Sequence, residues 1–268
     1  MRAAVLRRSV LAVPVATLVV LTPACGSSSD TPSARAGSPE ATVEAETATT
    51  ATLSTAELRK AALVQGDVPG YVVGKADEGI TGPGDVTVDR AVCLPFALAL
   101  FAAPQKGSVG ATGLTVTKPD TAGVDTGSVT SEDEVTEEVE KSVEMTTSLV
   151  TLASYEEEEE ATAALAGVRA AATACSAGFT ARVEGRTQEV FRILPAGANG
   201  GQAAAGWTTS VGDADKETPF SLVVARQGST LVSFTTMDAG AYLGKRPATD
   251  EVSGPPATLV SAQLAKLS

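Results

Sequence analysis

Residues 219–236 read PFSLVVARQGSTLVSFTT and contain two β-strand patterns separated by a tight turn. Both halves, 219–226 and 230–236, are rich in Val, Leu, Phe and Thr, the residue types that favour strands. The connection Arg226-Gln227-Gly228-Ser229 is short and contains glycine, which is typical of a β-hairpin. We therefore expect two adjacent antiparallel strands here.

Further strand and helix patterns precede and follow this hairpin. Strand patterns occupy residues 113–118, 139–154, 179–184, 187–194 and 204–211, and helical patterns occupy residues 89–102 and 156–175. A capping box at Ser54 and the pair Pro255-Pro256 each open a further helix. Runs of strands with helices before and after them predict an α+β fold, a mainly antiparallel sheet with helices packed on it. We expect residues 53–268 to form this single domain.

The start of the chain carries an export signal. Arg2, Arg7 and Arg8 precede an apolar stretch, residues 10–21, which at 12 residues is shorter than the roughly 20 that a membrane span needs. Residues 1–24 are therefore predicted to be a lipoprotein signal peptide, with Cys25 as the acylated first mature residue. Thr22 and Pro23 depart from the usual pattern, and the alternative is an ordinary signal peptide that leaves Cys25 as a free thiol.

Residues 25–52 are rich in Ser, Thr, Ala, Pro and Glu and nearly lack large apolar side chains. Such a segment cannot bury enough surface to fold, so we expect a disordered tether that holds the domain about 25–30 Å from the bilayer. The lipid on Cys25 would then attach the protein to the cell membrane, on its extracytoplasmic face.

The remaining cysteines, Cys93 and Cys175, form an even pair. In an exported protein such a pair predicts a disulfide, and the alternative is two buried thiols. Cys175 ends an apolar helical stripe that includes Ala161, Leu165 and Val168, so we expect it on the buried face at the end of its helix.

Composition and motifs limit the possible chemistry. The chain has no histidine, which excludes histidine-based triads and metal sites. No nucleophile elbow or phosphate-binding loop is present, so we predict no catalytic residue and no cofactor. The net charge of −12 becomes −15 when the three arginines of the signal leave, which disfavours nucleic acid as a partner.

The acidic clusters are interpreted as solvated structure, with no metal site. The run Glu156–Glu160 fits the positive end of a helix, whereas a calcium loop spaces its carboxylates around a glycine. Asp213, Asp215 and Glu217 could hold a hard cation but fit a hairpin turn better. Trp207, the only tryptophan, is expected in the core.

The layout resembles that of actinobacterial lipoproteins similar to the extracellular sensor domain of PknH-type serine/threonine kinases. The resemblance rests on these features: the Leu63–Tyr71 opening, Cys93 with Pro95, Ser154-Tyr155, Ala174-Cys175 with Phe179, the Val-rich hairpin and the C-terminal helix. It implies an α+β fold with a solvent cleft and a disulfide between Cys93 and Cys175. A second disulfide of the family has no counterpart here, and no catalytic residue is carried over.

These observations favour a membrane-anchored extracytoplasmic lipoprotein with a non-catalytic ligand-binding or sensing domain. Its partner would be an unknown small molecule or an envelope protein, and the sequence does not indicate the ligand-binding residues. One alternative is a carrier of lipid or another apolar molecule, which needs a large apolar cavity. Another is a carboxylate-based hydrolase, which needs two carboxylates about 5–10 Å apart.

Overall fold

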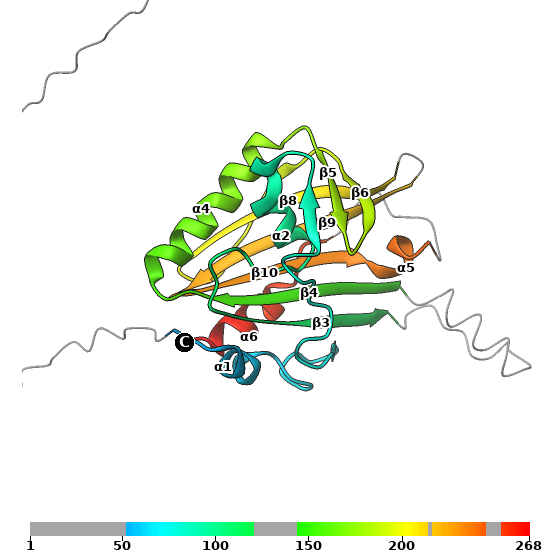
Figure 1. The fold of residues 1–268 in the computed structure, drawn as a ribbon. Coiled ribbons are helices and arrows are strands. Elements are labelled where there is room, and N and C mark those ends of the chain that lie inside the picture. Colours follow the sequence, from blue (N-terminus) through cyan, green and yellow to red (C-terminus); the bar gives the residue numbers. More distant parts are fainter. Residues whose placement is uncertain (1–51, 121–143, 214–215, 245–252) are drawn as a thin grey trace, which may run out of the picture. The chain divides into compact units, whose positions relative to one another are not determined.

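Ten strands form one sheet in a computed structural model of the chain, which describes residues 52–120, 144–213, 216–244 and 253–268. The order of the strands is β1-β3-β4-β10-β9-β8-β6-β5-β2, with β7 paired to β8, and Figure 1 shows the long strands β3, β4, β10, β9 and β8 side by side. Every pair is antiparallel. The strands are β1 (Val72–Val73), β2 (Val86–Val88), β3 (Gly110–Asp120), β4 (Glu144–Ser154), β5 (Phe179–Val183), β6 (Arg186–Val190), β7 (Leu194–Ala196), β8 (Ala203–Asp213), β9 (Lys216–Gln227) and β10 (Thr230–Asp238).

The hairpin expected from residues 219–236 lies in the middle of this sheet. Gln227 pairs with Thr230, and the two residues between them include Gly228 at φ 56°, a left-handed backbone that glycine adopts readily. On its other side β10 pairs with β4, where Thr230 faces Ser154. The predicted α+β class with a mainly antiparallel sheet is therefore confirmed.

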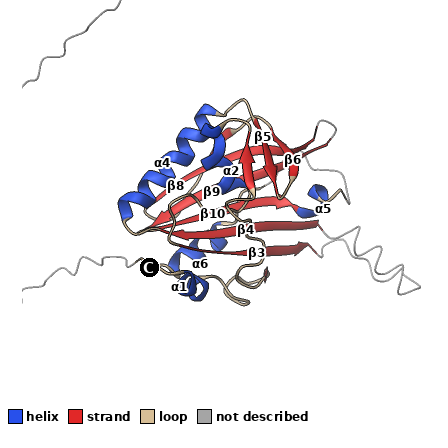
Figure 2. Cartoon of the chain, viewed as in Figure 1, coloured by secondary structure: helices blue, strands red, loops and turns tan. Residues whose placement is uncertain are grey.

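Helices cover both faces of the sheet (Figure 2). On one face lie α2 (Leu94–Leu100) and α4 (Glu158–Ala174), and on the other lie α1 (Thr55–Ala61) and α6 (Ala257–Ala265). All nine residues of β10 are consequently buried. Leu231 and Met237 contact the core beneath α2 and α4, while Val232 and Phe234 contact the core beneath α1 and α6. Successive side chains of β10 therefore point to opposite faces of the sheet and pack into two different cores.

Most of helix α2 is buried, and only its first two residues, Leu94 and Pro95, are partly exposed. Its sequence LPFALAL is apolar all round, as expected of a fully buried helix, and the five residues from Phe96 to Leu100 are buried. Phe96 contacts Phe179 and Trp207 edge-on, at 6.4 and 5.7 Å between ring centroids. Trp207 is 7% exposed, which confirms its expected core position. A short 3-10 turn, η1 (Ala91–Cys93), precedes α2, so the regular helix is shorter than residues 89–102.

A disulfide joins Cys93, before α2, to Cys175, which caps α4. Both residues are 0% exposed, and Cys175 lies on the buried face at the end of its helix, as expected. Gly178, at φ 99°, then turns the chain into β5. The bridge fixes the two helices that pack on the same face of the sheet.

Helices α1 and α6 are joined through Gln263, which is 0% exposed. Its Oε1 accepts a hydrogen bond from the Leu63 N–H at 3.1 Å, and its Nε2 donates to the Ala61 carbonyl at 2.8 Å. Close by, Lys266 Nζ lies 2.6 Å from a carboxylate oxygen of Asp67. The C-terminal segment is therefore attached to the first helix by polar contacts as well as apolar packing.

Three short elements are absent from the sequence expectation: β2, β7 and α5 (Ala239–Tyr242). Each has four residues or fewer, too few to show a period. The strand expected at 187–194 is instead two strands, because Ile193 leaves the sheet and its N–H donates to the Ser176 carbonyl. The strand expected at 139–154 is described only from Glu144 onward.

The signal peptide, Cys25 and the tether up to residue 51 lie outside the described residues. Thr52, the last residue of the expected tether, already donates a hydrogen bond to the Glu156 carbonyl at 2.9 Å. The described elements belong to one compact unit, residues 47–268. Across the described residues, no helix combines the length and apolar character that a membrane span requires.

Candidate functional site

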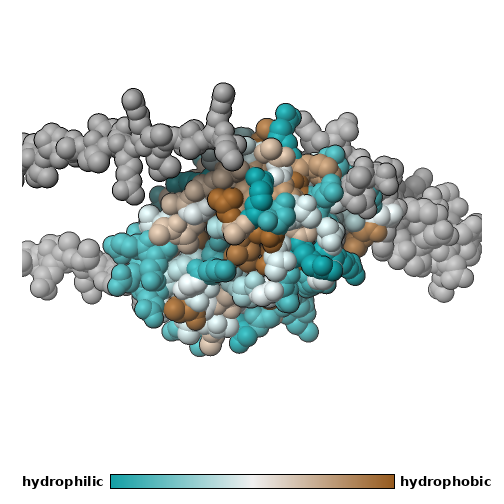
Figure 3. All heavy atoms as spheres, turned by 45° about the horizontal axis from the view of Figure 1, so that its top comes forward, coloured by the Kyte–Doolittle hydropathy of each residue, from teal (hydrophilic) through white to brown (hydrophobic). Residues whose placement is uncertain are grey.

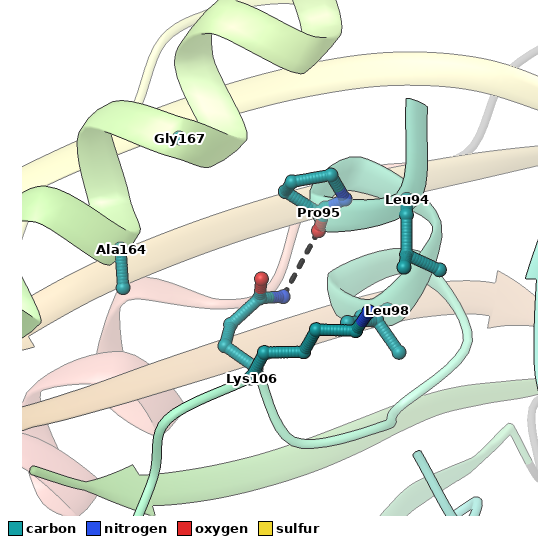
Figure 4. Close-up of a pocket in the computed structure, with 7 residues that line it drawn as sticks. Leu94, Pro95, Leu98, Lys106, Ala164 and Gly167 are labelled. Atoms are coloured by element: carbon teal, nitrogen blue, oxygen red, sulfur yellow. Dashed lines mark hydrogen bonds between the residues drawn. The ribbon is translucent and has the colours of Figure 1, made fainter. Parts of the chain in front are cut away.

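A pocket of about 150 Å³ opens between α2, α4 and the segment that follows α2. Figure 4 shows Ala164 and Gly167 on α4 facing the α2 side chains, with Lys106 extending in the direction of Leu98. The walls are mostly apolar, and two polar side chains complete them. The lining residues are Leu94, Pro95, Leu98, Gln105, Lys106, Ala164 and Gly167.

The backbone after α2 places Gln105 and Lys106 at this pocket. Ala102 adopts a left-handed conformation, φ 54°, and the Ala103 N–H donates to the Leu98 carbonyl at 2.8 Å, which closes the helix. The Ser108 hydroxyl then donates to the Gln105 carbonyl at 3.0 Å. This turn directs residues 105 and 106 back toward α2.

Gln105 is 7% exposed and supplies a fixed amide. Its Nε2 donates a 2.9 Å hydrogen bond to the Pro95 carbonyl, the dashed line in Figure 4. Its Oε1 accepts no hydrogen bond from the described residues and stays available as an acceptor. A ligand N–H or O–H could therefore bind there.

Lys106 is exposed and makes no ion pair with any described residue. Its ammonium group adds a positive charge at the solvent side of an otherwise apolar pocket. An apolar wall with one cation and one acceptor suits a small molecule that has an apolar body and an anionic group.

Gly167 lies in the middle of α4, where glycine destabilises a helix by about 0.8–1 kcal/mol relative to alanine. A Cβ atom added at Gly167 would meet no other atom within 4 Å. Helix packing therefore does not require a glycine here. The missing side chain instead leaves the pocket open on its α4 side.

The volume of the pocket limits what it can hold. About 150 Å³ matches a cavity that accepts benzene, and it lies below the roughly 300–1,000 Å³ of sites for drug-sized ligands. The pocket therefore favours a small ligand over the large apolar one that a carrier would hold.

The surface around the described domain is of mixed character. In Figure 3, apolar side chains gather near the centre of the described surface with hydrophilic ones around them. Val92, just before α2, and Val109, just after the Lys106 turn, are 52% and 50% exposed. Exposed apolar side chains therefore lie next to α2 and next to the turn that contains Lys106, which are two of the three segments that form the pocket.

The acidic residues considered from the sequence have structural positions. Glu156–Glu160 are exposed, and Glu158 at the start of α4 pairs with Arg226. Asp213 is the backbone register partner of Lys216 at the β8–β9 connection, as the hairpin-turn interpretation expected, and residue 215 lies outside the described residues. Within the described ranges, no three Cys, Asp or Glu side chains come together as candidate metal ligands.

Asp77 lies in a turn that follows β1. It pairs with Arg59 at 2.6 Å and accepts a 2.9 Å hydrogen bond from the Thr112 hydroxyl. The hydrogen bond from Arg59, followed by that from Thr112, holds the pKa of Asp77 below its ordinary value. This carboxylate therefore stays charged and fixes the loop before β2.

Sequence reasoning did not indicate any of the pocket residues. Gly167 carried a usable signal, because glycine interrupts an otherwise Ala- and Leu-rich helix. Gln105 and Lys106 carried none, because their role depends on the position of α4 beside α2.

Comparison with solved structures finds similar folds. The extracellular domain of PknH from Mycobacterium tuberculosis matches with a TM-score of 0.47 and 12% sequence identity, over 81% of this chain and 95% of that one. The resemblance is structural. No family model matches the chain, and no curated protein matches it.

Proposed function

We propose that this chain is a membrane-anchored extracytoplasmic lipoprotein whose domain binds a small anionic molecule in the pocket between α2 and α4, without catalysing a reaction. The observation that carries the proposal is the pocket itself: it has apolar walls, a Lys106 that forms no ion pair with a described residue, and a glycine that no packing contact requires. Each of these features favours a bound ligand over a merely imperfect core.

Two observations support the location. Cys93 and Cys175 form a buried disulfide, and such bonds persist in oxidising compartments outside the cytosol. The N-terminal sequence combines an export signal with Cys25 at its end. Acylation of Cys25 would supply the anchor, and Cys25→Ser should release the protein from membranes. Unchanged partitioning of that variant into detergent would refute the anchor.

The ligand class follows from the lining. Leu94, Pro95 and Leu98 would contact an apolar group about the size of an aromatic ring. Lys106 favours a carboxylate or another anion at the solvent side, and Gln105 Oε1 can accept a hydrogen bond. Benzoate has the first two features and can serve as a probe.

The experiment is an NMR titration of the purified chain with benzoate and, separately, with benzylammonium. We expect benzoate to bind with a Kd on the order of 1 mM, and benzylammonium more weakly, because Lys106 repels it. Gly167→Leu should abolish benzoate binding by filling the pocket, and Lys106→Met should weaken it about fivefold. The control is Gly167→Ala, which adds a single methyl group.

The control also tests the interpretation of Gly167. Gly167→Ala should increase the free energy of unfolding by about 1 kcal/mol, because the new Cβ meets no atom and helix propensity improves. Benzoate binding that is equal in the wild type and in a folded Gly167→Leu variant would contradict the proposed site.

A further inference from the structure

Another concavity, of about 250 Å³, lies where β6, β8 and β9 meet α5. Its polar lining includes Arg186 and Gln188 on β6, Lys216 and Thr218 on β9, and Tyr242 on α5. Residues two apart on a strand share a face, so Lys216 and Thr218 lie on the same face as Phe220. Phe220 belongs to the core beneath α2 and α4, which places the concavity on that face of the sheet.

The pleat of the strands places Arg186 and Lys216 on the face opposite to Glu189 and Glu217. Arg186 lies on the face of the buried Val190, and Lys216 on that of Phe220, whereas Glu189 and Glu217 occupy alternate positions and face the other side. Neither Arg186 nor Lys216 makes an ion pair with a described residue. Both cations line this hollow, where Asp213 is the register partner of Lys216.

Two neighbouring residues fix this arrangement. The Tyr242 ring packs edge-on against Phe220, with centroids 5.5 Å apart. Burial raises the pKa of the Tyr242 phenol. The positive charge of Arg186 lowers this pKa and the negative charge of Glu184 raises it, so both side chains lie close enough to Tyr242 to affect it. Lys216 Nζ lies against Gly244, because a Cβ built there would be 3.1 Å from it.

A hydroxyl group also lines the concavity, that of Thr218, a residue that is 2% exposed. Together with the Gln188 amide and the Tyr242 hydroxyl, it can donate to the oxygens of an anion.

We propose that this concavity binds a phosphate group, with Arg186 and Lys216 as its cationic contacts and Thr218 as a hydrogen-bond donor. Charge-assisted hydrogen bonds from Arg and Lys are the usual way in which proteins hold phosphate oxygens. The phosphate could belong to a soluble phosphorylated molecule or to a phospholipid headgroup. Both sources present the same oxygens to the same side chains.

Glu184 provides a variant that should improve binding. It has φ 49° and precedes Gly185, at φ 80°, in the two-residue turn between β5 and β6. Asn-Gly is the preferred pair for such a turn, so Glu184→Asn should preserve the hairpin. The substitution removes a negative charge that acts on Tyr242 and should strengthen phosphate binding about twofold to threefold.

The test uses the full chain with Cys25→Ser, so that no acyl group contributes, and follows Tyr242 and Lys216 by NMR. Titration with inorganic phosphate, at ionic strength balanced with chloride, should give saturable shifts. Arg186→Gln and Lys216→Gln should each weaken phosphate binding about tenfold. Matched controls are Lys118→Gln and Arg192→Gln, exposed cations outside the concavity, which should leave binding unchanged.

Vesicles of phosphatidylcholine with phosphatidylglycerol distinguish the two sources. Association with vesicles that Lys216→Gln abolishes identifies a lipid headgroup, and phosphate binding without vesicle association identifies a soluble ligand. Equal shifts with chloride alone would overturn the proposal. The proposal would also be overturned if Arg186→Gln and Lys216→Gln bound phosphate with the same affinity as the protein without these substitutions.

Discussion

Breaking the disulfide between Cys93 and Cys175 should destabilise the domain strongly. The two residues are 82 positions apart. Closing a loop of that length lowers the conformational entropy of the unfolded chain, which stabilises the folded state by about 4.5 kcal/mol at about 25 °C. For a unit of this size, each kcal/mol corresponds to about 2–4 °C, so the melting temperature should fall by about 9–18 °C.

The assay is guanidinium chloride unfolding followed by the fluorescence of Trp207, which is buried and unique in the chain. The oxidised protein is compared with the Cys93→Ala, Cys175→Ala double variant, both carrying Cys25→Ser. As a control, a reducing agent should shift the midpoint of the first protein and leave the double variant unchanged. Equal midpoints for the oxidised and doubly substituted proteins would refute the reasoning.

Three further predictions concern buried and paired polar groups. Gln263→Leu leaves two backbone groups unpaired and should lower the free energy of unfolding by about 2–4 kcal/mol. The control is Gln227→Leu at a partly exposed position, which should have little effect. Denaturant titration measures both free energies. The hydrogen bond from Lys266 holds the pKa of Asp67 below its ordinary value. This pair should therefore stabilise the fold above about pH 4, and the stabilisation should be lost as the pH falls through the lowered pKa. In Asp67→Asn, the pH profile of the free energy of unfolding should lack this contribution. The buried Tyr155 hydroxyl has no hydrogen-bond partner among the described residues, and burial raises its pKa. Tyr155→Phe should therefore leave the free energy of unfolding unchanged or increase it, and a loss above about 1 kcal/mol would show that the hydroxyl is bonded in solution.

The sequence was most informative where a pattern is long and local. The hairpin from β9 to β10 and helix α4 each span enough residues to show their period, and both occur where expected. Elements such as β2 and α5 exist because of their neighbours: β2 has three residues and is paired only along β5. Their formation depends on tertiary contacts that no local pattern contains.

The candidate pocket shows the same limit more sharply. Its walls come from residues 94–106 and from α4, and only the folded chain brings these together. The pairing of Cys93 with Cys175 could be expected, because an exported chain with two remaining cysteines has a single possible bridge. The role of Gln105 could not, because a polar residue in a loop has no distinguishing pattern.

The most direct test of the proposed function is native mass spectrometry of the protein isolated from its own host membrane, compared with Gly167→Leu isolated in the same way. Our account predicts a bound small molecule on the wild type, with an apolar body and an anionic group, that is absent from the folded variant. A wild type without bound mass, or the same mass on both proteins, would contradict it.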